Sequence, residues 1–176
     1  MAKPKQAFSW IQGNFVVTED SDRARELYAK SSFGKVSESK VYLSFFEALF
    51  LYDTGKLIVL DGRNKEMSRK SLVRRLSKSK DFLLKYSVFY DLRKKGYVVR
   101  TALKFGADFR VYDKGVKPGE DHARWIVFCV HESEKHTWKE FSAKMRVAHS
   151  TRKRLLIAAV DDESDVTYWE TSWIRP

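Results

Sequence analysis

The stretch Ala123-Arg-Trp-Ile-Val-Phe-Cys-Val130 is an apolar run with almost no polar break, and Leu155-Leu-Ile-Ala-Ala-Val160 has the same character. Runs of this kind predict strands covered on both faces, as the central strands of a mixed α/β sheet are. Between them, Thr137-Trp-Lys-Glu140 forms a capping box, which predicts that a helix begins there. The apolar residues that follow recur at helical spacing. We therefore expect an α/β domain built on these two strands.

The flanking segments extend this domain in both directions. A long helix is predicted from about Lys80 to Lys95, because apolar residues recur there every three or four positions and Gly96 stands where a terminating glycine is expected. Three more strands are predicted in this half of the chain: Tyr97–Thr101, Asp108–Asp113 and Val166–Trp173. The second domain is thus predicted to span residues 81–176, with a mixed sheet flanked by helices.

The first half of the chain reads as a small mixed α/β domain over residues 1–80. Ser44-Phe-Phe-Glu47 is a second capping box, so a helix is predicted from Phe45 to Asp53, ending near Gly55. The other predicted helices are Ser21–Ala29 and Ser68–Ser79, and the predicted strands are Phe15–Thr18, Val41–Leu43 and Leu57–Leu60. No flexible linker separates the two domains.

Composition limits the classes of function. The 176 residues include 34 Lys and Arg and 23 Asp and Glu, which gives a formal net charge of +11. A charge of this sign attracts polyanions such as nucleic acid or an acidic membrane surface. No apolar run reaches the ~20 residues of a membrane span, so a soluble, cytoplasmic protein is expected. The single Cys129 is interpreted as a buried apolar side chain. In the basic segment Ser68–Ser79 the charges are interpreted as a solvated face, with RNA contact as the alternative.

Three separated polar side chains stand at strand ends of the predicted sheet. In the strand Asp108–Asp113, alternation places Tyr112 on the polar face with Arg110. His122 follows a turn and precedes the central run, and Lys153 stands where a helix meets the next strand. Each residue alone is typical of a structural or exposed position. Together a phenol, an imidazole and an ammonium suffice to cleave RNA without a metal.

The remaining histidines, His131, His136 and His149, lack the spacing to acidic or thiol partners that a metal site needs. They are interpreted as structural, with a phosphate contact as the alternative for His149. We therefore expect neither a metal nor another cofactor.

The motifs closely resemble those of the archaeal tRNA intron endonuclease family. The matching segments are Phe105-Gly-Ala-Asp-Phe-Arg-Val-Tyr112, then His122 after a turn, then Arg146-Val-Ala-His-Ser-Thr-Arg-Lys153 followed by Arg-Leu-Leu. Ser44-Phe-Phe-Glu47-Ala-Leu resembles the family's N-terminal domain, so the resemblance covers roughly residues 30 to 176. It implies that the second domain has a restriction-endonuclease-like nuclease fold.

The resemblance also implies a role for each of the three residues. Tyr112 would be the general base that takes the ribose 2′-hydroxyl proton, His122 the general acid for the leaving 5′-oxygen, and Lys153 the cation that stabilises the charged phosphorus intermediate. The products would carry 2′,3′-cyclic phosphate and 5′-hydroxyl ends. Because a phenol is ionised only about one part in a thousand at pH 7, we expect the cleavage rate to rise with pH.

The family's substrate is precursor tRNA, cut at a bulge-helix-bulge whose bulged base is held by cationic or aromatic side chains of a neighbouring subunit. The resemblance assigns this clamp to Arg146 and Trp173, with Tyr168 and Trp169 as alternatives to Trp173. Further RNA contacts are expected from Arg110, Arg152 and Arg154.

Family members assemble so that two active sites face each other. The resemblance implies a homotetramer, or a heterotetramer with a non-catalytic relative. The loop Asp113–Asp121 carries Glu120 and Asp121 and resembles the acidic loop that docks into an opposing subunit.

Two other interpretations compete with this one. A metal-dependent nuclease on a similar core needs an acidic residue followed by an acid-x-Lys arrangement, and the residues after Asp108 or Asp113 do not provide that spacing. The second is a non-catalytic RNA-binding subunit, against which all three catalytic positions hold the required residue types.

Overall fold

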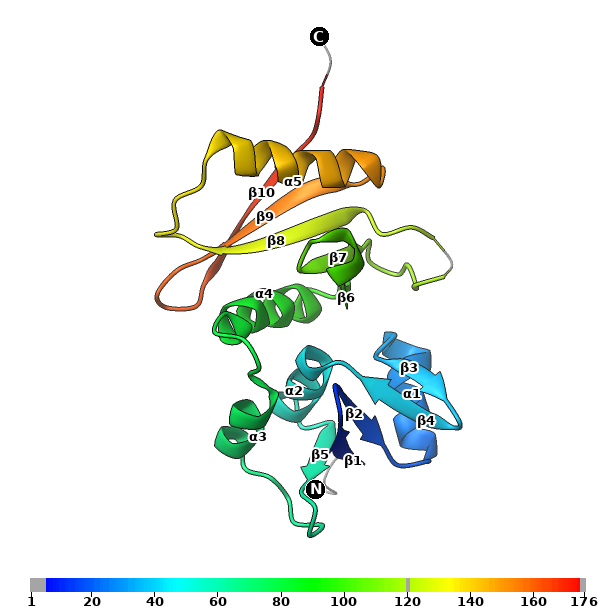
Figure 1. Cartoon of the computed structure of the whole chain (residues 1–176). Coiled ribbons are helices and arrows are strands. Elements are labelled where there is room, and N and C mark those ends of the chain that lie inside the picture. The colour runs from blue at the N-terminus through cyan, green and yellow to red at the C-terminus, as the bar shows by residue number, and fades with distance from the viewer. Residues whose placement is uncertain (1–5, 120, 175–176) are drawn as a thin grey trace. The chain divides into compact units, whose positions relative to one another are not determined.

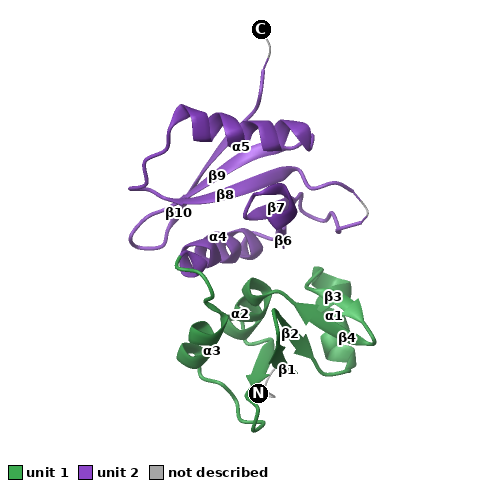
Figure 2. Ribbon diagram, in the orientation of Figure 1, with its two compact units in different colours: residues 1–80 green, residues 81–176 purple. Residues whose placement is uncertain are grey.

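The computed structural model describes residues 6–119 and 121–174 (Figure 1). The chain divides into two compact units, residues 1–80 and 81–176 (Figure 2). Each unit has its own five-stranded mixed sheet, which confirms the predicted α/β class. Within the described residues, no helix combines the length and apolar character that a membrane crossing requires.

Unit 1 is a sheet with helices packed on it. Its strands are β1 (Ala7–Gln12), β2 (Phe15–Thr18), β3 (Lys35–Ser37), β4 (Lys40–Leu43) and β5 (Leu57–Leu60), in the order β3-β4-β2-β1-β5. Its helices are α1 (Asp22–Ser31), α2 (Phe45–Asp53) and α3 (Arg69–Leu76). Strand β1 pairs antiparallel with β2 and parallel with β5, so the sheet is mixed.

The predicted capping box of α2 is present and reaches beyond the helix. Glu47 is buried, and its carboxylate accepts hydrogen bonds from the backbone N–H of Ser44 and of Gly34, both at 2.8 Å. Gly34 has φ +66°, and a Cβ there would lie 2.6 Å from the carbonyl oxygen of Tyr42. Glycine is therefore required at this position, and one carboxylate fixes both the start of α2 and the turn before β3.

Unit 2 contains the central strands that the apolar runs predicted. Its strands are β6 (Val98–Thr101), β7 (Phe109–Tyr112), β8 (Trp125–His131), β9 (Arg154–Val160) and β10 (Val166–Thr171), in the order β10-β9-β8-β7-β6. Its helices are α4 (Phe82–Lys94), the short 3₁₀ helix η1 (Leu103–Phe105) and α5 (Trp138–Ser150). Strands β8 and β9 are parallel, and the other neighbours are antiparallel.

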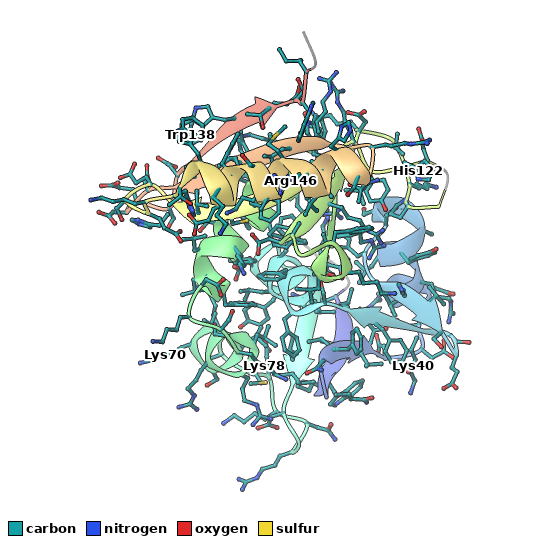
Figure 3. The ribbon with its side chains drawn as sticks, turned by 45° about the horizontal axis from the view of Figure 1, so that its top comes forward. Lys40, Lys70, Lys78, His122, Trp138 and Arg146 are labelled. Carbon is teal, nitrogen blue, oxygen red and sulfur yellow. The ribbon has the colours of Figure 1, made fainter. Side chains whose placement is uncertain are left out.

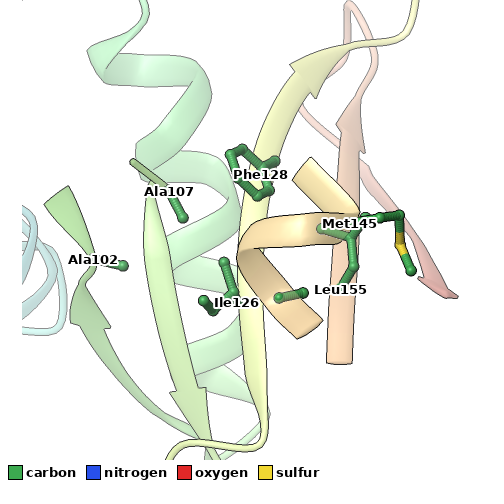
Figure 4. Close-up of a cluster of buried hydrophobic side chains, with 7 residues drawn as sticks. Ala102, Ala107, Ile126, Phe128, Met145 and Leu155 are labelled. Atoms are coloured by element: carbon green, nitrogen blue, oxygen red, sulfur yellow. The ribbon is translucent and has the colours of Figure 1, made fainter. Parts of the chain in front are cut away.

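Helices α4 and α5 cover opposite faces of this sheet (Figure 1). On one face, the ring of Phe89 from α4 lies 5.8 Å from that of Phe109 on β7. On the other face, α5 contributes to a buried cluster (Figure 4). The cluster consists of Ala102, Ala107, Ile126, Phe128, Met145, Ala148 and Leu155. The expectation that the central strands are covered on both sides is confirmed.

Strands β1 and β3 are absent from the sequence-based prediction. In β1 the small residues Ala7 and Ser9 face the core while Phe8 is 41% exposed, which inverts the usual burial pattern. Strand β3 is three residues long and wholly exposed. Neither strand shows the apolar alternation from which a strand is predicted. Pairing with neighbouring strands, which the sequence of one segment does not reveal, holds both in place.

Candidate active site

The topology of unit 2 brings the ends of three strands to one edge of the sheet. Strand β7 runs antiparallel to β8, and β8 runs parallel to β9. The end of β7 therefore lies beside the starts of β8 and β9. The backbone of Arg124 links all three, because its N–H donates to Val111 at 2.9 Å and its carbonyl accepts from Arg154 at 3.0 Å.

Lys153 is oriented by the way α5 ends. Arg152 adopts a left-handed conformation with φ +55°, and the backbone N–H of Lys153 donates back to the carbonyl of Ala148 at 2.8 Å. This reversal is the usual means of ending a helix, although here an arginine takes the position that glycine usually fills. The Lys153 ammonium donates to the carbonyl of Thr151 at 2.9 Å, so two of its three protons remain for a ligand.

A cavity of about 390 Å³ opens at this edge. It is lined by Phe105, Arg110, Tyr112, Gly119, Asp121, His122, Ala123 and Lys153. The structure thus brings together the phenol, the imidazole and the ammonium that the sequence analysis singled out. They come from three segments separated by 10 and 31 residues, and the sheet pairing joins them.

Tyr112 is more deeply buried than its predicted place on a polar face implied. It does share a face with Arg110, whose guanidinium carbon lies 5.9 Å from the ring centroid. However, the tyrosine is only 4% exposed. Its hydroxyl has no hydrogen-bond partner within residues 6–119 and 121–174.

His122 contrasts with Tyr112 because it is exposed at the cavity rim. Its backbone N–H donates to the Asp121 carboxylate at 2.6 Å, which fixes the backbone here. In the described part of the chain, the imidazole itself makes no hydrogen bond. Both ring nitrogens are therefore available to exchange a proton with a ligand.

The electrostatics of the cavity favour an anion. Partial burial, followed by repulsion from the Arg110 guanidinium, lowers the pKa of the Lys153 ammonium below its ordinary value. The buried Nε of Arg110 has no hydrogen-bond partner among the residues described. Two partly desolvated cations are thus close enough to repel each other, and a bound phosphate would relieve that repulsion.

A second cavity, of about 440 Å³, shares Lys153 with the first. It is lined by Arg124, Met145, Ala148, His149, Arg152, Lys153, Arg154, Ser172 and Trp173. The indole of Trp173 is 45% exposed and lies against the ring of His149, with centroids 5.3 Å apart. Three of the residues predicted to contact RNA therefore gather here: Arg152, Arg154 and Trp173.

The other two aromatic candidates for the clamp lie elsewhere. Tyr168 donates its hydroxyl to Asp91 at 2.7 Å, and burial together with that carboxylate raises the pKa of Tyr168 well above its ordinary value. Trp169 lines a third cavity, which has a volume of about 590 Å³ and is also lined by Trp138. Of the three, Trp173 alone borders the cavity that contains Lys153.

Arg146 and Glu120 complete the set of predicted residues. Arg146 is exposed on α5 and lines neither the first nor the second cavity (Figure 3). Glu120 lies outside the described residues, whereas Asp121 of the same loop lines the first cavity.

Two acidic side chains of unit 2, those of Asp108 and Asp113, form ion pairs, whereas Asp121, which lines the first cavity, accepts a hydrogen bond from the backbone N–H of His122. Asp108 forms an ion pair with Lys85 at 2.8 Å and accepts a hydrogen bond from the backbone N–H of Cys129 at 2.8 Å. Asp113 pairs with Arg124 at 3.1 Å. Sequence reasoning missed this use of Asp108, and only the pairing of distant segments identifies it. Burial, followed by the charge of Asp108, raises the pKa of the Cys129 thiol, as expected for an unreactive cysteine.

Comparison with known proteins gives matches along nearly the whole chain. Residues 82–168 match the tRNA intron endonuclease, catalytic C-terminal domain, and residues 10–73 match the tRNA intron endonuclease, N-terminal domain. The tRNA-splicing endonuclease of Thermococcus kodakarensis is 39% identical, covering 94% of this chain and 97% of its own. That of Methanothermobacter thermautotrophicus is 39% identical (93% and 96%), and that of Nanoarchaeum equitans is 41% identical (76% and 90%).

Proposed function

Because the chain belongs to the tRNA intron endonuclease family, and is therefore an endonuclease of tRNA introns, we propose that it cuts RNA by metal-independent transesterification. The observation that carries the proposal is the single cavity lined by Tyr112, His122 and Lys153. These groups supply the base, the acid and the cation that attack by a 2′-hydroxyl needs.

In the proposed reaction, the Tyr112 phenolate takes the proton of the ribose 2′-hydroxyl next to the scissile phosphate. The 2′-oxygen then bonds to phosphorus, and the bond from phosphorus to the 5′-oxygen breaks. The His122 imidazolium gives its proton to that departing oxygen. The products are a 2′,3′-cyclic phosphate and a 5′-hydroxyl, and atoms and charges balance without water.

Lys153 and Arg110 have the electrostatic role in this scheme. Negative charge builds up on the non-bridging phosphate oxygens as the 2′-oxygen attacks, and preorganised cations stabilise it most effectively in a partly desolvated site. Both side chains line the cavity, and neither forms an ion pair within the described segments. Their charge is therefore available to the phosphate.

The test of metal independence is cleavage in a chelator. The engagement of Asp113 by Arg124 and of Asp121 by the backbone N–H of His122 supports the metal-free reaction, because a divalent ion would have to displace those partners. We expect the purified chain to cut a bulge-helix-bulge RNA at an undiminished rate in excess EDTA, with 2′,3′-cyclic phosphate and 5′-hydroxyl ends identified by mass spectrometry. Loss of activity that Mg²⁺ restores would instead indicate a metal-dependent nuclease.

We further propose that the substrate is precursor tRNA folded as a bulge-helix-bulge, cut in the cytoplasm. Two junctions must be cut, so we propose a homotetramer or a heterotetramer with a related non-catalytic subunit, docked through the acidic loop Asp113–Asp121. Arg146 and Trp173 would clamp a bulged base bound at a neighbouring subunit's site. The exposure of Arg146 and the partial exposure of Trp173, whose indole lies against His149, support this role, since both side chains leave surface for a base.

Truncation of either clamp residue is expected to weaken cleavage. Stacking of a base on an aromatic or guanidinium face contributes about 1–3 kcal/mol, so Trp173→Ala and Arg146→Ala should each lower kcat/KM about 5- to 150-fold. Steady-state kinetics on bulge-helix-bulge RNA would measure this. Phe15→Ala and Arg23→Ala, exposed side chains of unit 1, are the matched controls. Normal cleavage by Trp173→Ala with loss in Arg146→Ala would mean that another residue completes the clamp.

A further inference from the structure

The excess positive charge of unit 1 is confined to a short segment. Residues 63–80 contain eight Lys and Arg and one acidic residue, a net charge of +7 in 18 positions. Residues 1–62 contain eight basic and eight acidic residues and have no net charge. Residues 81–176 contain 18 basic and 14 acidic residues. Most of the chain's charge of +11 therefore lies in the unit that contains none of the proposed catalytic groups. We call residues 63–80 the basic segment.

The structure displays this charge on the surface. The basic segment consists of the loop after β5, helix α3 and the residues that follow it. Helix α3 buries Leu72 and Leu76, so its remaining faces are directed away from the core. All eight cationic side chains are exposed: Arg63, Lys65, Arg69, Lys70, Arg74, Arg75, Lys78 and Lys80. Figure 3 labels Lys70 and Lys78 in this part of unit 1.

Six of the eight cationic side chains have no ion-pair or hydrogen-bond partner among the described residues, and three of the six lie on α3. Arg69 pairs with Asp53 at 2.8 Å, and Lys78 donates to Asn14 at 2.8 Å, so these two contribute to the fold. By contrast, Lys70, Arg74 and Arg75 form no ion pair or hydrogen bond with any residue described.

Local stability accounts for only part of this charge. Arg74 and Arg75 stand in the last turn of α3, where a cation is favourable, but Lys70 stands in the first turn, where it is not. Lys70 and Arg74 are also four residues apart, where like charges repel. The helix contains four cations and no acidic residue, and a cluster of unpaired cations on a surface is typical of a site that binds a polyanion.

We infer that the basic segment binds the sugar-phosphate backbone of the substrate outside the cleavage junctions, through Lys70, Arg74 and Arg75. The inference rests on the proposed function for its polyanion, an intron-containing tRNA. Lys and Arg on one helix face contact phosphates without reading bases, which suits a region whose sequence differs between tRNAs. The surface would add affinity for whole precursor tRNA that a short junction RNA does not receive.

The test compares two RNAs and two triple variants. One RNA is a whole precursor tRNA and the other is a minimal bulge-helix-bulge, both with 2′-deoxyribose at the scissile positions so that binding is measured without cleavage. The first variant is Lys70→Gln, Arg74→Gln, Arg75→Gln. The control is Arg23→Gln, Lys35→Gln, Lys40→Gln, which removes three exposed charges from the neutral part of the same unit. Fluorescence anisotropy over a series of KCl concentrations gives the affinities.

We expect the first variant to bind precursor tRNA roughly tenfold more weakly, with the slope of log affinity against log salt reduced by about 2–3. Its affinity for the minimal RNA and its cleavage rate on an unmodified minimal RNA should be unchanged, as should all values for the control. Equal weakening on both RNAs, or the same loss in the control, would overturn the inference. Binding of the same variants to phosphatidylglycerol vesicles is measured alongside. Unchanged RNA binding combined with lost vesicle binding would also overturn the inference. Failure of the proposed cleavage chemistry would appear separately, as an inactive wild type.

Discussion

Tyr112→Phe is expected to slow the chemical step about 10²- to 10⁴-fold, the usual contribution of a general base. The substitution removes one oxygen atom and keeps the buried ring that lines the cavity. Because the hydroxyl has no hydrogen-bond partner among the described residues, its loss leaves no buried group unsatisfied, and the melting temperature should not change. Single-turnover cleavage of bulge-helix-bulge RNA and thermal unfolding would measure the two effects.

Tyr97→Phe is the matched control, because its ring packs against Trp125 and lies outside the cavity. It should cleave at the wild-type rate. A loss restricted to Tyr112→Phe, with RNA affinity retained, would identify the phenol as the base. Undiminished cleavage by Tyr112→Phe would refute its assignment and leave His122 and Lys153 without a partner in the proposed scheme.

The elements that sequence reasoning recovered are those whose signals are local. The capping box of Ser44 and Glu47 predicted helix α2 at its observed bounds, and the apolar run Leu57–Leu60 predicted β5 equally well. A side-chain cap and a burial pattern depend on residues close in sequence. Helix α4 begins two residues later and ends one residue earlier than predicted, and strand β10 ends two residues earlier, because the exact ends of an element carry the weakest sequence signal.

The candidate site was partly accessible to the same reasoning. The motifs and the family resemblance identified Tyr112, His122 and Lys153. The burial of Tyr112 and the ion pair between Asp108 and Lys85 could not be predicted, because both depend on how distant segments pair. Alternation along β7 indicated the face of Tyr112 correctly and said nothing of what covers it.

Lys153→Met is expected to reduce kcat about 10²- to 10³-fold, since it removes one preorganised cation from the developing phosphate charge. Methionine keeps the unbranched stem at this half-buried position, so the fold should be retained. Lys139→Met, an exposed lysine on α5, is the control. Single-turnover rates with saturating RNA separate this effect from weaker binding, and a rate within threefold of wild type would exclude Lys153 from the reaction.

The pH dependence gives a second, independent test of Lys153. Its pKa is lowered by burial and by Arg110, and the charged form is the one that stabilises phosphate, so activity should fall as pH rises through that lowered value. The wild-type profile should therefore decline on its alkaline side. Arginine stays protonated throughout this range, so Lys153→Arg should keep partial activity and lose the part of the decline that the Lys153 ammonium causes. If the decline persisted unchanged in Lys153→Arg, another group would be responsible for it, and the ammonium would have no part in the alkaline limb.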